Sequence, residues 1–466
     1  MAGRRALAVL LAVLGLGAGG YVAADVYDVA PGRLTLAPPP ATPAPFPTAP
    51  GALDTLVLDV PLPQLDPDAQ TPAPAAVTSL AEALVADPRM GSSTGVVVAD
   101  VLTGEVLADV GGARPRTPAS TAKLLTELAA IRALGPERTL STRVVQPEPG
   151  RIVLVGGGDM LLSAGAGDPE AVNGRAGLAD LAAATARQLR LAGTTEVSLG
   201  LDDSLFTGPA RHAGWRPSYL SSGYVAPVAA LAVDVARTRD AFYAPRYADP
   251  AMQAAQVFAD LLAAQGITVG RPTSSPGAGA APQLAAVESA PMREIVRLTV
   301  QESDNTLAEV LGRLVALERG LPGSFSGATS AVVAEAAAEG IDVSGVVIAD
   351  CSGLADGSAI PARTLVDLLL LASRPGNFDL LPVVLDLPIS GWQGTLAGRF
   401  GDGPARGLVR AKTGSLPRVT ALAGTLQTQS DRLLVFAVLA DATPPGGQLR
   451  PQAAIDEFCQ QLAGLA

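Results

Sequence analysis

Apolar side chains recur with helical spacing directly after a Thr117-Pro118 pair. Threonine is a typical N-cap residue, and proline is accepted at the first helical position because its missing N–H would have no partner there. The spacing predicts a buried helix that runs to about Gly135. Its apolar face is formed by Leu124, Leu125, Leu128, Ile131 and Leu134. The first turn carries Ser120, and Lys123 follows three residues later on the same face.

Strand-like patterns lie before this helix and again near the end of the chain. Residues 94–100 and 105–110 predict two strands joined by a tight turn. Three more strands and a closing amphipathic helix are expected at residues 409–415, 421–427, 432–440 and 453–465. A helix that starts near Val77 and ends before Pro88 precedes all of them. We expect strands from both ends of the chain to form one antiparallel five-stranded sheet flanked by helices, in a mixed α/β (α+β) fold.

The middle of the chain follows a different pattern, in which strand-like runs alternate with helices. The expected strands include residues 151–155 and 196–201, and the expected helices are residues 178–191 and 252–265. We therefore expect one or more inserted domains at residues 142–290. The inserted part would interrupt a domain made of residues 75–141 and 291–466.

A run of three glycines and an aspartate, from Gly156 to Asp159, lies inside the inserted part. A phosphate-binding loop would need a lysine and a following helix, and this run has neither. A tight turn is the better interpretation.

The N-terminus has the features of an export signal. Two arginines precede an uncharged apolar run from Ala6 to Ala24. This run is long for the apolar part of a signal peptide and just long enough to span a membrane, so residues 1–24 are interpreted as a signal peptide or a membrane anchor. Residues 25–74 are rich in Pro and Ala and are expected to form an extended spacer. The protein is therefore expected to be exported and to work outside the cytoplasm.

Composition and charge exclude some classes of function. The chain of 466 residues carries 33 basic and 44 acidic side chains, a net charge of -11, which argues against nucleic acid as a partner. The single histidine, His212, lies in a stretch rich in Gly, Trp and Pro, so a structural role is favoured over a Ser-His-Asp triad or a zinc site. Cys351 and Cys459 are too few for a disulfide framework; a pair and two unpaired buried thiols are both open.

Ser120 and Lys123 form the first candidate catalytic pair. A serine hydroxyl needs a base to become a nucleophile, and a partly desolvated lysine can be that base. The Ser-x-x-Lys spacing alone is weak evidence because it also arises by chance on solvated helix faces.

Two further stretches strengthen the case for a catalytic site. Ser303 and Asn305 stand two residues apart before a buried helix, where capping residues are also common. Lys412, Thr413 and Gly414 lie on a predicted strand, where a lysine can simply protect a sheet edge. Each motif, taken alone, can be explained by its own ordinary structural role. The three motifs together, in the order Ser-x-x-Lys, Ser-x-Asn and Lys-Thr-Gly, indicate an acyl-transfer site.

In these motifs the sequence resembles the penicillin-recognising serine acyl-transferases, which include penicillin-binding proteins and serine β-lactamases. It is most similar to the D-alanyl-D-alanine carboxypeptidase/D-alanyl-D-alanine-endopeptidase family, the low-molecular-mass class C penicillin-binding proteins. The resemblance covers nearly everything after residue 75 and rests on the segments 118–124, 156–159, 303–305, 350–354, 394–396 and 410–415. It implies a transpeptidase/β-lactamase-like fold with a large insertion. Met160 stands where the family usually has proline, and a local loop effect is expected.

The resemblance also implies catalytic roles for individual residues. Ser120 would attack the carbonyl of the penultimate D-alanine, and Lys123 would take its proton. Lys123 would then need a pKa lowered by burial and by the nearby charge of Lys412. Ser303 would relay a proton to the leaving amine. The backbone N–H groups of Ser120 and Ser415 would form the oxyanion hole.

Substrate binding would involve the remaining motif residues. Asn305 would hold a substrate amide and orient Lys123. Lys412, Thr413 and Ser415 would bind the terminal carboxylate of the substrate, and Gly414 would let the substrate backbone approach the strand. No metal or organic cofactor is implied. The expected partners are peptidoglycan stem peptides, with β-lactams as inhibitors, and a membrane if the N-terminal segment is not cleaved.

The motifs favour a D,D-peptidase of the cell wall or the outer face of the cytoplasmic membrane over two alternatives. A class A β-lactamase needs a Glu-x-x-x-Asn deacylation loop, and none is found between Asn305 and Lys412. A catalytically degenerate wall-binding or scaffold protein would have no use for intact Lys123 and Ser303. The sequence leaves open whether the substrate is a free D-Ala-D-Ala terminus or a D,D cross-link.

Overall fold

The computed structural model describes residues 17–27, 29, 65–374 and 376–465. The chain divides into two compact units, residues 1–64 and 65–466. In the first unit, residues 17–26 are helical. No helix among the described residues combines the length and apolar character that a membrane crossing requires. Most of the predicted export segment (residues 1–16) and most of the predicted spacer (residues 30–64) lie outside the described residues.

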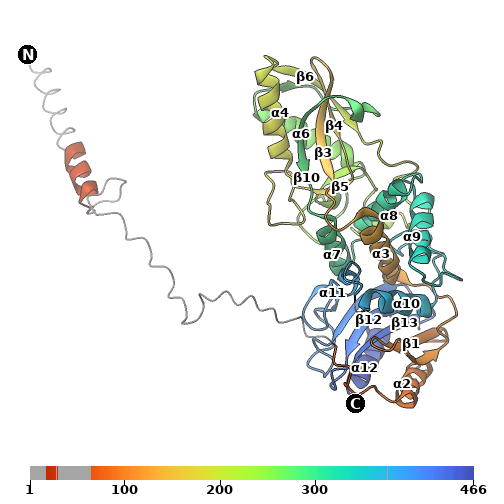
Figure 1. Cartoon of the computed structure of the whole chain (residues 1–466). Coiled ribbons are helices and arrows are strands. Elements are labelled where there is room, and N and C mark those ends of the chain that lie inside the picture. Colours follow the sequence, from red (N-terminus) through yellow and green to blue (C-terminus); the bar gives the residue numbers. More distant parts are fainter. Residues whose placement is uncertain (1–16, 28, 30–64, 375, 466) are drawn as a thin grey trace, which may run out of the picture. The chain divides into compact units, whose positions relative to one another are not determined.

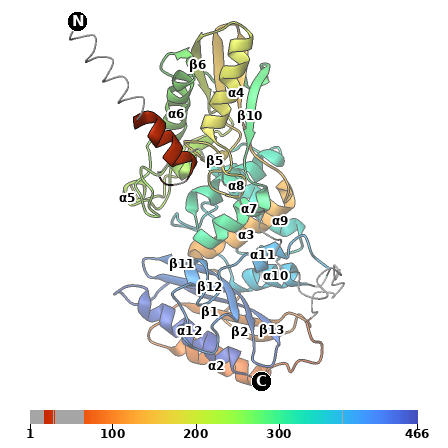
Figure 2. The ribbon, with the colours of Figure 1, turned by 90° about the vertical axis from the view of Figure 1, so that its left-hand side faces the viewer.

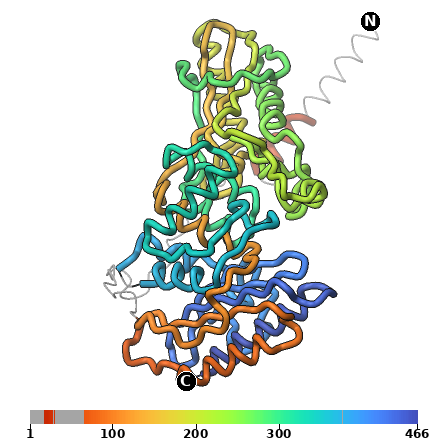
Figure 3. Tube along the Cα trace, turned by 90° about the vertical axis from the view of Figure 1, so that its right-hand side faces the viewer, coloured from red at the N-terminus to blue at the C-terminus, as the bar shows by residue number. Residues whose placement is uncertain are grey.

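A five-stranded antiparallel sheet forms one end of the second unit (Figure 1). Its order is β11 (Val409–Leu416), β12 (Val419–Gln427), β13 (Leu433–Ala440), β1 (Thr94–Asp100) and β2 (Val106–Val110). The two ends of this unit meet where β1 pairs with β13, from Thr94 opposite Ala440 to Asp100 opposite Leu434. Figure 3 shows the orange and blue segments side by side in this sheet. The five predicted strands and their antiparallel arrangement are confirmed.

Helices cover both faces of this sheet. On one face, α2 (Pro74–Ala86) and α12 (Leu449–Ala463) pack on Val96 and Val98 of β1. On the other face, α3 (Lys123–Leu134) and α10 (Ala362–Ser373) join Val97 and Ala99 in a second hydrophobic cluster. Successive side chains of a strand point to opposite faces, so a strand buried on both sides needs an unbroken apolar run such as Val96 to Ala99.

A helical layer separates this sheet from the inserted part (Figures 1 and 2). Besides α3 it contains α7 (Met292–Glu302), α8 (Asn305–Glu318) and α9 (Phe325–Ala338), and α3 packs against all three. The short helix α11 (Pro382–Leu385) and the 3₁₀ turns η1 (Ala119–Ala122) and η4 (Gly394–Leu396) complete the surroundings of β11.

The inserted part is built on a second sheet with both parallel and antiparallel pairs. Its order is β10 (Gln283–Glu288), β3 (Ser141–Glu148), β4 (Arg151–Val155), β6 (Glu196–Asp202) and β8 (Thr268–Val269), with β9 (Thr273–Ser274) also paired to β6. The helices α4 (Leu178–Leu191) and α6 (Pro250–Ala264) pack beside it, and β5 (Asp159–Leu162) pairs with β7 (Leu231–Val233). The chain enters through β3 and leaves through β10, and these two strands are neighbours. The predicted turn at the glycine run is confirmed: it connects β4 to β5, with Gly158 at a φ of 104°.

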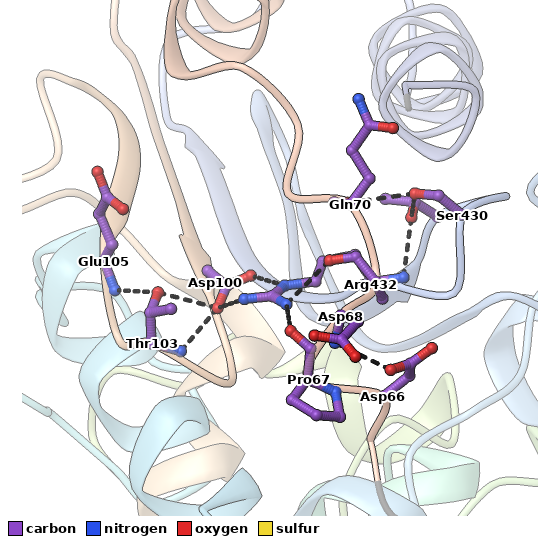
Figure 4. Close-up of polar contacts among 11 residues, drawn as sticks. Asp66, Pro67, Asp68, Gln70, Asp100, Thr103, Glu105, Ser430 and Arg432 are labelled. Carbon is purple, nitrogen blue, oxygen red and sulfur yellow. Dashed lines mark hydrogen bonds and ion pairs between the residues drawn. The ribbon is translucent and has the colours of Figure 1, made fainter.

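The segment before α2 is tied to the five-stranded sheet (Figure 4). The Arg432 guanidinium is almost completely buried and pairs with Asp100 across 2.5 Å. It also donates to the carbonyl oxygens of Pro67 (3.4 Å) and Ala69 (3.1 Å), and the Ser430 hydroxyl donates to the carbonyl of Gln70 at 3.3 Å. Residues 67–70, which the sequence places in the spacer, therefore lie against the folded body.

The two cysteines and the single histidine make packing and hydrogen-bond contacts within the fold. Cys351 and Cys459 are buried, unpaired and located in separate hydrophobic clusters. The Nδ1 atom of His212 accepts a hydrogen bond from the backbone N–H of Gly214 at 3.0 Å. The imidazole also makes an edge-on contact with Phe325, at 5.0 Å between ring centroids.

Candidate active site

Ser120 lies in the 3₁₀ turn η1, directly before α3. Side chains three residues apart eclipse one another in 3₁₀ geometry, so Ser120 and Lys123 face each other directly. The predicted start of this helix is wrong in detail. Pro118 occupies the N-cap position without a side-chain cap, and the Thr117 N–H donates instead to Asp441 at 3.2 Å. The helix ends at Gly135 as expected.

The Lys123 ammonium is completely buried and has three hydrogen-bond acceptors. It donates to Ser120 Oγ at 3.0 Å, to Asn305 Oδ1 at 2.7 Å and to the Ser352 carbonyl oxygen at 2.8 Å. Burial lowers the pKa of Lys123 to about 8, although nearby carboxylates, led by Asp350, act in the opposite direction. An amine with this pKa is partly neutral near pH 8 and can take the proton of Ser120.

Ser303 and Asn305 lie on the tight connection between α7 and α8. Ser303 ends α7 in the left-handed conformation, with a φ of 56°. Asp304 caps α8 by accepting the N–H of Leu307 at 2.9 Å. The capping role considered for Ser303 and Asn305 is therefore wrong, because it belongs to the residue between them. A non-glycine residue at positive φ is strained, and such strain persists where the surrounding structure imposes it.

Lys412 approaches Ser303 from β11 on the opposite side of the site. Its completely buried Nζ donates to Ser303 Oγ at 2.8 Å and to the Thr413 carbonyl at 3.1 Å. Burial lowers the pKa of Lys412 well below its usual range, and the Lys123 charge lowers it further. Burial is the main cause of the lowered pKa of Lys123, as expected, and the two buried amines repel each other.

Gly414 permits a close approach between β11 and the segment that carries Ser120. A Cβ atom at position 414 would lie 2.6 Å from the Pro118 carbonyl oxygen and 3.3 Å from the Ala119 Cβ. The absence of a side chain at position 414 therefore also permits close packing between β11 and the segment that carries Ser120, while its expected role toward the substrate backbone stays a prediction. Ala119 itself has a φ of 48°, so this segment is strained. The Thr413 hydroxyl, half-buried on the same strand, donates to the hydroxyl of Thr395 in η4 at 2.9 Å.

A loop at residues 350–355 fixes the carbonyl that receives Lys123. The Asp350 carboxylate accepts the backbone N–H groups of Gly353 (2.7 Å) and Ala355 (2.8 Å) and the indole N–H of Trp215 (2.8 Å). Gly353 has a φ of 73°, and a Cβ there would lie 1.9 Å from the Ala119 carbonyl oxygen. The glycine is thus required both by its conformation and by the strained segment beside it.

Glu309 of α8 also holds the loop at residues 350–355. Its completely buried carboxylate accepts the N–H groups of Cys351 (3.1 Å) and Ser352 (2.8 Å). Burial raises the pKa of Glu309 to about 8, with the Asp350 charge in the same direction. The loop is therefore held by two carboxyl groups, so the Ser352 carbonyl has a fixed position.

A cleft of about 1020 Å³ opens beside Ser120. One wall comes from the catalytic motifs, including Ser303, Asn305, Thr413 and Ser415. The other wall comes largely from the inserted part and is aromatic and basic: Arg216, Tyr219, Tyr224, Arg237, Phe242, Tyr243 and Arg246. The Tyr224 carbonyl accepts a hydrogen bond from Asn305 Nδ2 at 2.9 Å, which links the two walls.

The structure brings every predicted site residue to this cleft or directly behind it. Ser120, Ser303, Asn305, Thr413 and Ser415 line it. The two lysines lie buried behind their hydroxyl partners, and Gly414 lies in β11 against the segment that carries Ser120. Sequence reasoning missed the functions of Ser352, Glu309 and Tyr224. Of these three residues, only Ser352 could have been singled out from the sequence, because it lies in the 350–354 segment. Its contribution is a backbone carbonyl. Among the described residues, no group of three or more His, Cys, Asp or Glu side chains is arranged to hold a metal ion.

The chain is similar to known proteins over most of its length. The family model of the D-Ala-D-Ala carboxypeptidase 3 (S13) family matches residues 77–245 and 236–462. A carboxypeptidase of Mycobacterium tuberculosis is 37% identical over 390 residues, covering 82% of this chain and 83% of that protein. The carboxypeptidase DacB of Mycolicibacterium smegmatis is 36% identical over 451 residues, covering 95% of this chain and 94% of its own.

The crystal structure of penicillin binding protein 4 (DacB) from Haemophilus influenzae superimposes with a TM-score of 0.68 at 22% identity. It covers 82% of this chain and 98% of its own, which supports the penicillin-recognising fold expected from the sequence. The family-model match and the two mycobacterial relatives settle the classification. The chain belongs to the D-Ala-D-Ala carboxypeptidase 3 (S13) family.

Proposed function

We propose that the protein is a serine D,D-peptidase that cleaves the bond after the penultimate D-alanine of peptidoglycan stem peptides. One observation carries the proposal: the buried Lys123 amine contacts Ser120 Oγ on one side of the cleft, and Lys412 contacts Ser303 Oγ on the other. Two hydroxyl groups, each paired with a buried amine, supply a nucleophile with its base and a second group that can move a proton.

Acylation begins at Ser120. The neutral Lys123 amine takes the hydroxyl proton as Oγ bonds to the carbonyl carbon of the penultimate D-alanine. The backbone N–H groups of Ser120 and Ser415 stabilise the negative oxygen of the tetrahedral intermediate. The C–N bond then breaks, and the Ser303 hydroxyl relays the proton gained by Lys123 to the leaving nitrogen. The products are free D-alanine and an ester on Ser120, and both lysines return to their starting charge.

Deacylation repeats these steps with water. Lys123 takes a proton from the water molecule that attacks the ester, and the proton returns to Ser120 Oγ as the ester bond breaks. Hydrolysis therefore needs no further group, which is consistent with a peptidase whose acyl-enzyme is accessible to water.

Substrate orientation comes from both walls of the cleft. Lys412, with Thr413 and Ser415, binds the terminal carboxylate of the substrate. Asn305 uses one amide N–H for the Tyr224 carbonyl and has a second N–H for a substrate carbonyl. The aromatic and basic wall of the inserted part contacts the rest of the stem peptide. β-Lactams acylate Ser120 through the same steps because their ring amide occupies the place of the scissile peptide bond.

The location of the activity follows from the substrate. Peptidoglycan lies outside the cytoplasmic membrane, so the protein acts there, and the N-terminal segment exports it and anchors it in the membrane if it is not cleaved. The same site accepts a free D-Ala-D-Ala terminus or a D,D cross-link, which differ only in what is attached to the leaving D-amino acid.

The proposal is tested by incubating the full chain with a fluorescent penicillin, beside a Ser120→Ala variant, and mapping the adduct by mass spectrometry. A long-lived adduct on the Ser120 peptide, absent in the variant, supports the peptidase. Rapid loss of label with accumulation of hydrolysed penicillin would instead favour a β-lactamase. Absence of any label would contradict both and favour a binding protein without catalysis.

A further inference from the structure

Residues 215–226 belong to the inserted part, yet they contact the catalytic motifs directly. The segment contains the short helix α5 (Ser218–Ser221), labelled in Figure 2, and gives the side chains of Tyr219 and Tyr224 to the wall of the cleft. It also makes hydrogen bonds behind that wall, which substrate binding alone does not explain. These hydrogen bonds lead to Lys123.

Trp215 is held on two sides. Its side chain is 5% exposed and contacts Phe325 of α9 edge-on, at 5.3 Å between ring centroids. Its indole N–H donates to the Asp350 carboxylate at 2.8 Å. Asp350 is completely buried, and its other two donors among the described residues, the N–H groups of Gly353 and Ala355, belong to its own loop. Trp215 is therefore the donor that ties this loop to the inserted part.

The same segment is bonded to the start of α8. The Tyr224 carbonyl accepts a hydrogen bond from Asn305 Nδ2 at 2.9 Å, and the Ala226 N–H donates to the Thr306 hydroxyl at 2.9 Å. Thr306 is 0% exposed, so the second bond is shielded from water. With Nδ2 bound to Tyr224, the Asn305 amide presents Oδ1 to the Lys123 ammonium at 2.7 Å.

Lys123 is the point at which these contacts converge. Its three acceptors are Ser120 Oγ, Asn305 Oδ1 and the Ser352 carbonyl oxygen. The first belongs to the nucleophile. The inserted segment holds the other two, Asn305 directly and Ser352 through the loop that carries it. A buried ammonium depends on its acceptors, so the positions of these two oxygens affect how tightly Lys123 holds its proton.

We propose that Trp215 is a positioning residue through which the inserted part fixes the acceptors of Lys123. The inference rests on the proposed function, in which Lys123 takes the proton of Ser120. Trp215 acts through Asp350 and the Ser352 carbonyl and touches no reacting atom. The inserted part is thus a component of the catalytic site as well as a wall of the cleft. Without the indole N–H the loop loses this link, and Lys123 should lose its proton at lower pH.

The composition of the chain allows the indole N–H to be removed alone. Trp215 and Trp392 are the only two tryptophans in the sequence, and Trp392 is 72% exposed. In a Trp392→Phe background, benzothienylalanine, a tryptophan analogue with sulfur in place of the N–H, enters the full chain only at position 215. The analogue keeps the ring shape and the contact with Phe325. The reference is Trp392→Phe with ordinary tryptophan, which should behave as the unchanged protein.

The first readout is the titration of Lys123 itself. The chain has two lysines, so labelling with ¹³C at Cε and ¹⁵N at Nζ gives two side-chain signals, which Lys412→Arg assigns by the loss of one. With the analogue, the Lys123 signal should titrate at least about 0.5 pH unit lower than in the reference, as expected for a weakened hydrogen bond. The comparison leaves in place the charged groups that face Lys123: Asp350, Glu309, Asp304, Glu127 and Lys412.

Acylation by penicillin is the second readout. The analogue should slow it about tenfold at the plateau of the pH profile, because a base held less firmly meets the hydroxyl in the right geometry less often. The midpoint of the profile should move down together with the Lys123 signal.

Thr306→Val tests the second contact of the segment. It removes the hydroxyl that accepts the Ala226 N–H and keeps the shape of the side chain, so the Lys123 signal should again titrate lower. The matched control is Thr185→Val in α4. It removes another hydroxyl from a side chain that is 0% exposed, one that donates to the Leu181 carbonyl within its own helix, and it should leave the Lys123 titration unchanged.

Two results would overturn the inference. An unchanged Lys123 titration with the sulfur analogue would assign Trp215 to packing, even if Tm fell. Equal shifts in Thr306→Val and Thr185→Val would show that Lys123 responds to the loss of any buried hydroxyl. If the reference protein formed no adduct with penicillin and hydrolysed no peptide, the proposed function would fail. The titrations need no substrate and would still decide whether the inserted part fixes the acceptors of Lys123.

Discussion

The Nζ atom of Lys412 donates to the Oγ atom of Ser303 across 2.8 Å, although the two residues are 109 positions apart in the chain. The bond joins the edge strand of the five-stranded sheet to the turn between α7 and α8. It therefore holds the two sides of the proposed catalytic site together, at the point where the proposed mechanism moves a proton. Removing the hydroxyl would also leave Lys412 with only the Thr413 carbonyl as an acceptor.

We expect Ser303→Ala to slow acylation of Ser120 by roughly 10²- to 10⁴-fold, the usual contribution of a positioned proton-transfer group. The measurement is the rate of adduct formation with a fluorescent penicillin, together with hydrolysis of a D-Ala-D-Ala peptide. Ser198→Ala, which removes an exposed hydroxyl from β6 of the inserted part, is the control and should leave acylation unchanged. Acylation by Ser303→Ala at the unchanged rate would exclude a role for this hydroxyl in proton transfer.

The shifted pKa of Lys123 predicts how acylation depends on pH. Only the neutral amine accepts a proton, and burial lowers the pKa of Lys123 to about 8. The acylation rate should therefore rise as pH increases through about 8 and level off above it. Stopped-flow measurement of penicillin acylation between about pH 6 and pH 10 gives this profile. A rate that is constant over the whole range would mean that Lys123 is not the base.

The same shift predicts a change in stability. The folded chain loses the Lys123 proton near pH 8, whereas the unfolded chain keeps it up to the ordinary value of 10.5. Between these limits the unfolded state binds more protons, so this group makes the protein more stable as pH rises. Chemical unfolding at several pH values, with Lys123→Met as the variant that lacks the group, measures this effect. The free energy of unfolding of the variant should rise less with pH across that window.

Local patterns were sufficient to predict the elements of the fold. Residues 94–100 are strand β1 and residues 178–191 are helix α4, each with the bounds expected from spacing and composition. The strand is an unbroken apolar run and the helix buries apolar side chains with helical period, and each pattern is a property of the segment itself. The motifs likewise identified Ser120, Lys123, Ser303 and the Lys412 strand because the required residue types are rare in that order.

Contacts between distant segments were beyond the reach of the sequence. The third acceptor of Lys123 is the backbone carbonyl of Ser352, which any residue type supplies. Glu127 falls among apolar positions of α3, yet its carboxyl group is completely buried, which depends on the elements that pack over that helix. The cap expected at Thr117 is not formed: Pro118 occupies the N-cap position, and the Thr117 N–H donates to Asp441 from the far end of the chain. Tertiary partners outweighed the local preference in each case.

The close packing of Gly414 against the Ser120 segment leads to a fourth prediction. In Gly414→Ala the new Cβ would meet the Pro118 carbonyl oxygen at 2.6 Å and the Ala421 Cβ at 3.0 Å, so β11 or η1 must move. We expect a loss of stability of about 1–3 kcal/mol, typical of overpacking. Acylation should fall by more than this loss explains, because Ser120 is displaced. Gly270→Ala, with no atom within 4 Å of the added Cβ, is the control and should change neither quantity.

The ion pair between Arg432 and Asp100 leads to the last prediction, which concerns the segment before α2 (Figure 4). Arg432 is 4% exposed and Asp100 is 0% exposed, so removal of the guanidinium leaves a buried charge without its partner. We expect Arg432→Met to destabilise the protein by about 3–5 kcal/mol. The carbonyls of Pro67 and Ala69 lose their donor at the same time, so limited proteolysis should cut near these residues earlier than in the unchanged protein.

Arg89→Met is the matched control, because it removes an arginine whose acid partners, Asp87 and Glu457, are more exposed. Its effect on stability should stay below about 1 kcal/mol. Acylation of Ser120 by penicillin at a temperature where both variants are folded should match the unchanged protein, because neither arginine lines the cleft. Slower acylation in Arg432→Met alone would show instead that the anchored segment and the catalytic site are coupled through β1 and β13.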